Sequence, residues 1–185
     1  KILNINNNNY FDYAGGSGGF IDILCFPFAR GRIFNNLEQD VGQYNDKNEI
    51  FWSSGCCFIT RKDLFIKIQF DTTLFAYMEE IDYAWKSILM GYKNVVEPKS
   101  IIFHDGGELK SRNFFKSYMN HRNSMILFIT NHNTILMILL LIPKILLELI
   151  SLTRYLIILN ITAFNAQIFS YLWILCHPIY LLKRI

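Results

Sequence analysis

Short blocks of hydrophobic and polar residues fill the first two thirds of the chain, and long apolar runs fill the last third. The short blocks predict strands at Lys1–Ile5 and Ile50–Arg61, with a turn at the asparagine run Asn6–Asn9. Arg61–Phe65 is predicted to form a single helical turn, and the polar stretch Asn35–Glu49 a loop. These blocks therefore predict an N-terminal region built of short elements.

The clearest helical pattern begins at a cluster of acidic residues. Between Glu79 and Met90, apolar residues recur at the spacing of one helix face, at Ile81, Ala84, Trp85, Ile88 and Leu89. Short strands are predicted at Tyr92–Glu97 and Ile101–His104, followed by a second helix at Ser111–Asn131. Acids at a helix start and a histidine at a strand end can converge on one cleft, and that arrangement suits metal binding or general-base chemistry.

The same acids also have a purely structural explanation. Glu79, Glu80 and Asp82 lie in the first helical turn, where carboxylates compensate the positive end of the helix dipole. Asp82 stands four residues before Lys86, the spacing of an ordinary helical ion pair. A lone histidine such as His104 is also more often structural than a ligand. On spacing alone, the structural explanation of the acids is the favoured one.

Residues 10–34 form a glycine-rich segment that continues into aromatic and basic residues. Its glycines permit backbone angles closed to other residues, so they predict a shaped loop. The segment does not match a phosphate-binding loop, because the Gly-Lys-Ser/Thr ending is absent. One interpretation is a surface loop that packs its aromatic side chains inward. In the other, Arg30 and Arg32 lie near an anionic substrate group, since guanidinium groups match phosphate oxygens.

Long Leu and Ile runs begin after Asn133. Thr134–Leu159 is long enough to cross a bilayer, and Phe164–Leu182 is a second apolar segment after a turn at Asn160–Ala163. Four polar residues of the first segment share one helical face, namely Lys144, Glu148, Ser151 and Tyr155. This stripe favours a helix that lies in the membrane interface. A spanning helix whose stripe faces a partner is the alternative.

Composition supports membrane association. Of the 185 residues, 52% are hydrophobic and 18% are charged, which is more apolar than an ordinary soluble domain. Basic residues flank the apolar pair on both sides, which fits a hairpin with two cytoplasmic ends and equally well two helices on an anionic inner leaflet. We expect a domain at residues 1–132 and a membrane-associating helical pair at 133–185, at the cytoplasmic face of the inner (cell) membrane.

Charge and cysteine content argue against two other classes of partner. The net charge of +3 is too weak to indicate a nucleic-acid partner. The four cysteines show no C-x-x-C spacing, which argues against a zinc site. We expect them to be buried, reduced thiols in a cytosolic environment.

Several segments between Tyr10 and Thr130 occur in an order that resembles a known enzyme family. They are YFDYAGGSGGFID with PFARGRIF, FWSSGCCFITRKDLF, FDTTLFAYMEEIDYAWK, and GYKNVVEPKSIIFHDGG followed by a basic helix with HRN. Together they resemble the C-terminal half of the catalytic domain of family 2 glycosyltransferases, of the rhamnosyltransferase-like inverting group. The resemblance implies a GT-A-type α/β fold, a nucleotide-sugar donor, a glycan or lipid-linked acceptor, and a divalent metal, Mg²⁺ or Mn²⁺.

The resemblance also implies residue roles. The family's Glu-Asp pair stands here as Glu79-Glu80, so Glu80 would be the catalytic base, one methylene longer than Asp, and Glu79 its partner. His104 matches a strand-end histidine that faces the metal and the diphosphate. Arg122 matches an arginine near the cleft that would contact the diphosphate. The residues expected to bind substrate are Trp52, Ser53, Ser54, Gly55, Asp82, Arg30, Arg32 and Arg122.

The family's nucleotide-binding strands and Asp-x-Asp metal motif precede the part matched here. We therefore expect a fragment that is inactive alone. The leading hypothesis is an inverting, membrane-associated glycosyltransferase that extends a cell-surface glycan. The alternative is a non-catalytic remnant or membrane-docking module that keeps the fold. A third hypothesis is a small membrane protein with a metal-binding head.

Overall fold

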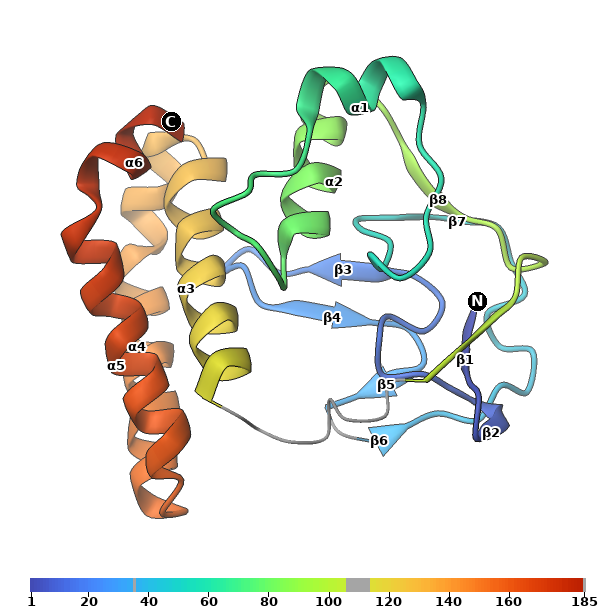
Figure 1. Ribbon diagram of the computed structural model, residues 1–185, viewed down its shortest axis with the longest axis horizontal. Helices are drawn as coiled ribbons and strands as arrows, with labels where there is room; N and C mark the ends of the chain where they lie inside the picture. The colour runs from blue at the N-terminus through green and yellow to red at the C-terminus, as the bar shows by residue number, and fades with distance from the viewer. Residues whose placement is uncertain (35, 106–113, 185) are drawn as a thin grey trace. The chain divides into compact units, whose positions relative to one another are not determined.

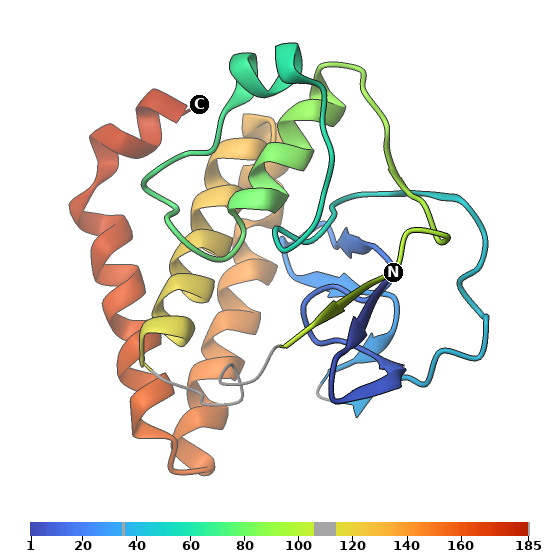
Figure 2. The same cartoon turned by 45° about the vertical axis from the view of Figure 1, so that its right-hand side comes forward.

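The computed structural model describes residues 1–34, 36–105 and 114–184, which form two compact units (Figures 1 and 2). We call the first the sheet unit; it comprises Lys1–Asp22, Phe26–Thr72 and Glu79–Lys110. The second is the helical unit, which comprises Ile23–Cys25, Thr73–Met78 and Ser111–Ile185. The boundary expected at residue 132 does not coincide with this division, because the helix before it packs with the helices after it.

A three-stranded sheet lies at the centre of the sheet unit. Strand β1 (Ile2–Asn4) runs parallel to β9 (Ile102–His104) and antiparallel to β2 (Asn7–Phe11). The strands predicted at Lys1–Ile5 and Ile101–His104 are confirmed by β1 and β9. The turn predicted over the whole asparagine run is wrong, because Asn7 onward pairs with β1. The Asn4 carboxamide oxygen accepts the backbone N–H groups of Asn6 and Asn7, which confines the turn to the residues before the new strand.

Three two-stranded antiparallel sheets complete the strands of the sheet unit. They are β3 (Gly19–Ile21) with β4 (Pro27–Ala29), β5 (Arg32–Ile33) with β6 (Asn36–Leu37), and β7 (Asn48–Ile50) with β8 (Asn94–Val96). The strand predicted to run from Ile50 to Arg61 is wrong beyond its start, because only Trp52 bridges to Gly19 and the chain then leaves the sheet. Helix α1 (Lys62–Ile68) is longer than the single turn predicted there.

Helix α2 (Glu79–Leu89) confirms the predicted helix, although Leu89 of the predicted apolar face is exposed. Ile81 and Ala84 are buried, and Trp85 packs edge-on against Phe51 with ring centroids 5.4 Å apart. The helix ends where Gly91 adopts a φ of +85°, and the Gly91 N–H donates to the Ile88 carbonyl. Its first turn carries the acidic cluster.

The helical unit contains α3 (Phe114–Asn131), α4 (Thr134–Ile157), α5 (Ile161–Cys176) and α6 (Pro178–Arg184). Helices α3, α4 and α5 run side by side in both views (Figures 1 and 2). Asn133 and Asn160 cap α4 and α5, since their side chains accept backbone N–H groups three residues on. The apolar segment expected to be continuous from 164 to 182 is broken at Pro178. The predicted start of α3 at 111–113 lies outside the described residues.

The polar stripe of α4 is buried against its neighbours. Lys144 and Glu148 have side-chain exposures of 0% and 4%, and their charged groups lie 2.9 Å apart. Lys144 also donates to Ser124 on α3, at 3.0 Å. From α5, the Tyr171 hydroxyl and the Gln167 amide donate to Glu148 at 2.7 and 3.0 Å. The stripe thus faces partner helices, as in the alternative weighed for the sequence.

The opposite face of α4 is exposed and apolar. Its exposed residues include Ile135, Ile138, Leu139, Ile142, Leu146, Leu149, Ile150 and Ile157. Within the described residues, α4 is the one helix of sufficient length and apolar character to cross a membrane, and the shorter α5 is also apolar. Helix α4 therefore turns its polar stripe inward and its apolar face outward. The chain as a whole mixes helices with small sheets, which confirms the α/β class in its broad sense.

Candidate active site

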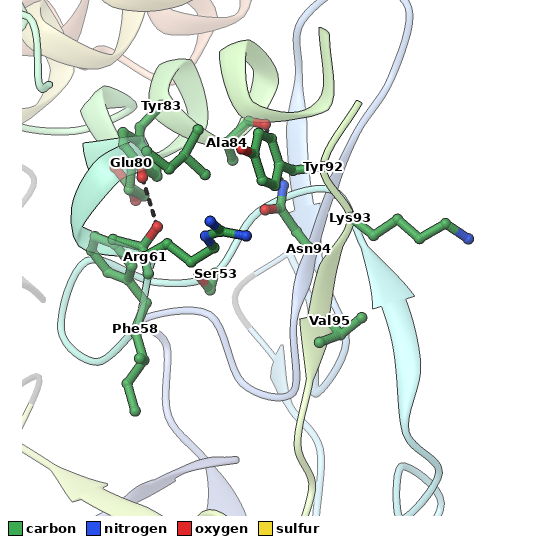
Figure 3. A pocket seen from close by; sticks show the side chains of 13 residues that line it. Ser53, Phe58, Arg61, Glu80, Tyr83, Ala84, Tyr92, Lys93, Asn94 and Val95 are labelled. Carbon is green, nitrogen blue, oxygen red and sulfur yellow. Dashed lines mark hydrogen bonds between the residues drawn. The ribbon is translucent and has the colours of Figure 1, made fainter. Parts of the chain in front are cut away.

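A polar cavity of about 200 Å³ opens beside the start of α2 in the sheet unit (Figure 3). Its walls include Glu80 and Tyr83 from α2, Ser53 and Thr60 from the loop after β7, and Asn94 from β8. The hydroxyl groups of Thr60 and Tyr83 lie 2.7 Å apart and are hydrogen-bonded. The cavity therefore offers one carboxyl group together with hydroxyl and amide groups, the cationic side chains of Arg61 and Lys93, and apolar walls such as Phe58 and Val95.

The neighbouring carboxyl groups of Glu79 and Glu80 form a half-buried pair. Burial raises the pKa of Glu79 above its ordinary value, and its backbone hydrogen bond and a side-chain hydrogen bond with Glu80 oppose that rise. The raised pKa makes Glu79 easier to protonate than an ordinary surface glutamate.

The loop of small residues predicted to leave room for a ligand lies against this pair. Ser53 lines the cavity, and a methyl group on Gly55 would stand 3.7 Å from Oε1 of Glu79 and 4.0 Å from Cβ of Glu80. Ser54 is buried, and its hydroxyl oxygen accepts the backbone N–H of Cys56 at 3.3 Å. The structure thus brings Ser53 and Gly55 together with both predicted catalytic glutamates.

Trp52 supports this loop from the core of the sheet unit. Its indole N–H donates to the Phe20 carbonyl at 2.8 Å, and its ring fills the space over Gly19. A methyl group on Gly19 would stand 1.9 Å from the Trp52 ring. Trp52 is 7% exposed and is not among the residues that line the cavity. Its substrate contact stays a prediction, and in this geometry the indole anchors the residues that follow it.

A second cavity of about 370 Å³ shares Ser53, Phe58, Ile59 and Val95 with the first. Its other walls include three glycines of the glycine-rich segment, Gly15, Gly16 and Gly18. The shaped loop predicted from these glycines therefore borders a space that adjoins the carboxyl pair.

His104 has a different partner from the one expected. Its Nδ1 lies 2.9 Å from Oδ1 of Asp12, a buried carboxylate that also accepts the backbone N–H of Ala14. His104 lines neither of the two cavities. Among residues 1–34, 36–105 and 114–184, no three His, Cys, Asp or Glu side chains form a group that could hold a metal ion. A divalent metal ligated by His104 stays a prediction from the resemblance, and no chemical step is derived through it.

Arg30, Arg32 and Asp82 interact with other groups of the sheet unit. Arg30 donates from Nε to the Ser17 carbonyl at 2.9 Å, and Arg32 donates to the Tyr13 carbonyl at 3.1 Å. Neither arginine is among the residues that line the two cavities. Asp82 is buried and lies 2.7 Å from Lys86, which confirms the helical ion pair. Their substrate contacts stay predictions.

Arg122 belongs to the helical unit, where it binds backbone carbonyl groups. Its Nη2 donates to Thr73 at 2.6 Å and to Leu74 at 3.3 Å. A diphosphate contact by Arg122 stays a prediction. Sequence reasoning gave no role to Asn123 beside it or to Asp12. Neither stands in a pattern that marks a buried polar anchor.

Comparison of the chain with protein-family models, with curated proteins and with solved structures found no match. The resemblance to family 2 glycosyltransferases therefore stays a prediction from the sequence. The functional argument rests on the geometry of the carboxyl pair and its cavity.

Proposed function

We propose that this chain carries the catalytic base of a membrane-associated, inverting glycosyltransferase. The substrates would be a nucleotide-sugar donor and a cell-surface glycan or lipid-linked acceptor. The observation that supports this proposal best is the position of Glu80, which lines a polar cavity next to Glu79 and the small residues Ser53 and Gly55. A sugar acceptor presents hydroxyl groups, and the side chains of Ser53, Thr60 and Tyr83 are matching hydrogen-bond partners.

The chemistry needs a base within roughly 3 Å of the acceptor hydroxyl. Glu80 takes the hydroxyl proton while the acceptor oxygen attacks the anomeric carbon from the face opposite the leaving group. The bond from that carbon to the nucleoside diphosphate breaks, and the diphosphate leaves with the electron pair. Glu79, whose pKa is raised by burial, stands next to Glu80 in the first turn of α2.

The helical unit would hold this enzyme at the cytoplasmic face of the membrane. Two observations support this location, namely the apolar outer face of α4 and the buried polar network between α3, α4 and α5. A helix with this polarity is stable when lipid surrounds its outer face, because the polar side chains keep their hydrogen-bond partners inside the unit.

Sugar transfer by the complete reading frame that contains this chain tests the proposal. Membranes from cells that express it are supplied with a panel of labelled nucleotide sugars, and label in lipid and glycan fractions is counted. With the best donor, Glu80→Gln should lower kcat by about 10²–10⁴-fold, the range for loss of a general base, and leave KM for the donor within twofold. Glu49→Gln is the matched control, since Glu49 is an exposed carboxylate of the same unit and lines neither cavity.

Retained transfer in Glu80→Gln would remove Glu80 from the base role. A wild-type protein that transfers no sugar from any donor, yet sediments with membranes, would favour the second candidate, a membrane-docking module. The apolar outer face of the helical unit is the observation that favours that candidate.

A further inference from the structure

The six residues Thr73–Met78 of the helical unit follow an unusual backbone path. Phe75, Tyr77 and Met78 have φ values of +57°, +64° and +69°, the left-handed region that side chains other than glycine rarely adopt. The Ala76 N–H donates to the Leu74 carbonyl at 2.7 Å, which closes a tight turn around Phe75. Such strain persists only where neighbouring groups hold the backbone in place.

Two adjacent side chains of α3 hold this segment. The Asn123 carboxamide nitrogen lies 3.0, 3.0 and 2.6 Å from the carbonyl oxygens of Leu74, Ala76 and Tyr77. Arg122 Nη2 donates to the carbonyl oxygens of Thr73 and Leu74. We call Arg122 and Asn123 the carbonyl clamp. Asn123 is 0% exposed and Arg122 7% exposed, so water cannot readily replace these donors.

A hydrogen bond between its two residues and contacts with two aromatic rings hold the carbonyl clamp in position. Arg122 Nε donates to the Asn123 side-chain oxygen at 3.0 Å, which orients the Asn123 amide nitrogen toward the segment. The guanidinium group lies over the rings of Trp173 on α5 and Tyr118 on α3, at 4.9 and 5.5 Å from their centroids. Arg122 Nη2 and the Asn123 amide nitrogen are therefore both directed at Thr73–Met78.

The segment ends at Met78, and the next residue along the chain is Glu79, the first residue of α2. We propose that Arg122 and Asn123 are positioning residues, which hold the left-handed segment and thereby fix the backbone conformation of the residues that immediately precede Glu79 in the chain. This inference rests on the proposed role of Glu80 as a base. It gives Arg122 a different role from a diphosphate contact.

Hydrogen exchange tests the clamp without reference to activity. In Asn123→Ala, the Ala76 and Tyr77 carbonyl groups lose this side-chain donor and the Leu74 carbonyl loses one of its donors, so peptides that cover residues 73–84 should exchange at least about tenfold faster than in the wild type. Asn120→Ala is the matched control on the same helix, because the Asn120 amide donates only to the Lys116 carbonyl of α3. Unchanged exchange at residues 73–84 in Asn123→Ala would overturn the inference, whatever the transfer assay shows.

Kinetics separate positioning from a general loss of stability. Asn123→Ala should lower kcat by roughly 10–100-fold with donor KM within twofold, the size of effect that misplacement of a catalytic group produces. The double variant Asn123→Ala with Glu80→Gln should be no slower than Glu80→Gln alone, because the clamp acts through Glu80. Losses that multiply in the double variant would contradict the inference.

A rescue variant gives a further test. The Phe75 side chain is 74% exposed, so Phe75→Gly relieves the left-handed strain at that position and removes little packing. Added to Asn123→Ala, it should restore part of both the lost exchange protection and the lost kcat. Exchange that stays as fast as in Asn123→Ala would show that backbone strain is not what the clamp holds.

Discussion

The buried ion pair between Lys144 and Glu148 gives the sharpest test of the helical unit. Lys144→Met leaves the Glu148 carboxylate without its cation inside the bundle, 2.9 Å from the deleted charge. Removal of one partner of a buried pair costs about 3–5 kcal/mol, because the remaining charge stays desolvated. An exposed pair costs only about 0.2–1 kcal/mol. The size of the loss therefore reports whether the stripe faces partner helices.

The double variant Lys144→Met with Glu148→Gln completes the cycle. It removes both charges and keeps a side-chain oxygen that can accept from Tyr171 and Gln167, so its cost should be clearly smaller than the sum of the two single costs. The free energy of unfolding is measured by denaturant titration in mixed micelles, followed by circular dichroism. Lys93→Met is the matched control, since Lys93 and Glu49 form an exposed pair.

Single costs below about 1 kcal/mol with additive behaviour would refute this reasoning. That result would mean that water reaches both charges. The helix would then lie in the membrane interface with its stripe toward solvent, as the sequence pattern first favoured.

Two further predictions concern the sheet unit. Because the folded pKa of Glu79 is raised, the fold is favoured while the carboxyl is protonated, and that contribution is lost as pH rises through the folded pKa. Glu79→Gln should therefore raise the melting temperature at pH 8 and leave it unchanged near pH 4; a lower value at pH 8 would contradict this. Gly19→Ala places a methyl group 1.9 Å from the Trp52 ring and should cost about 1–3 kcal/mol in denaturant unfolding. In Gly55→Ala the new methyl group meets no atom closer than 3.7 Å, so the free energy of unfolding should change by less than about 0.5 kcal/mol. Equal losses of stability in Gly19→Ala and Gly55→Ala would refute the packing argument.

Sequence patterns predicted the elements that depend on neighbouring residues in the chain. Helix α2 follows from the spacing of its apolar residues and ends at Leu89, shortly before Gly91. The ion pair of Asp82 with Lys86 follows from helix geometry alone. Strand β2 was missed because asparagine is a turn former by propensity, and its pairing with β1 is a tertiary effect.

The candidate site was predicted only in part, for a related reason. The sequence indicated the carboxyl pair and the small-residue loop, and the structure brings Ser53, Gly55, Glu79 and Glu80 together. The sequence could not show that Arg122 binds backbone carbonyl groups. The left-handed residues before Glu79 are not glycine or asparagine, so the sequence carries no signal for a left-handed backbone there. The α4 stripe was visible as a pattern, but what it faces depends on two other helices.

The cysteines illustrate the same limit. Cys25 is buried, as expected, whereas Cys56, Cys57 and Cys176 are exposed. The adjacent pair was expected in a buried strand, and it lies in the loop that replaces that strand. Once the chain leaves the sheet after Trp52, the apolar composition of the segment no longer determines burial.

The central claim is that the carboxyl group of Glu80 removes the acceptor proton. The most direct measurement is the initial rate of sugar transfer by Glu80→Ala in the complete reading frame, with and without added formate. The account predicts a loss of about 10²–10⁴-fold without formate, and a partial recovery as formate enters the space left by the side chain. A wild-type rate in Glu80→Ala without formate would contradict it.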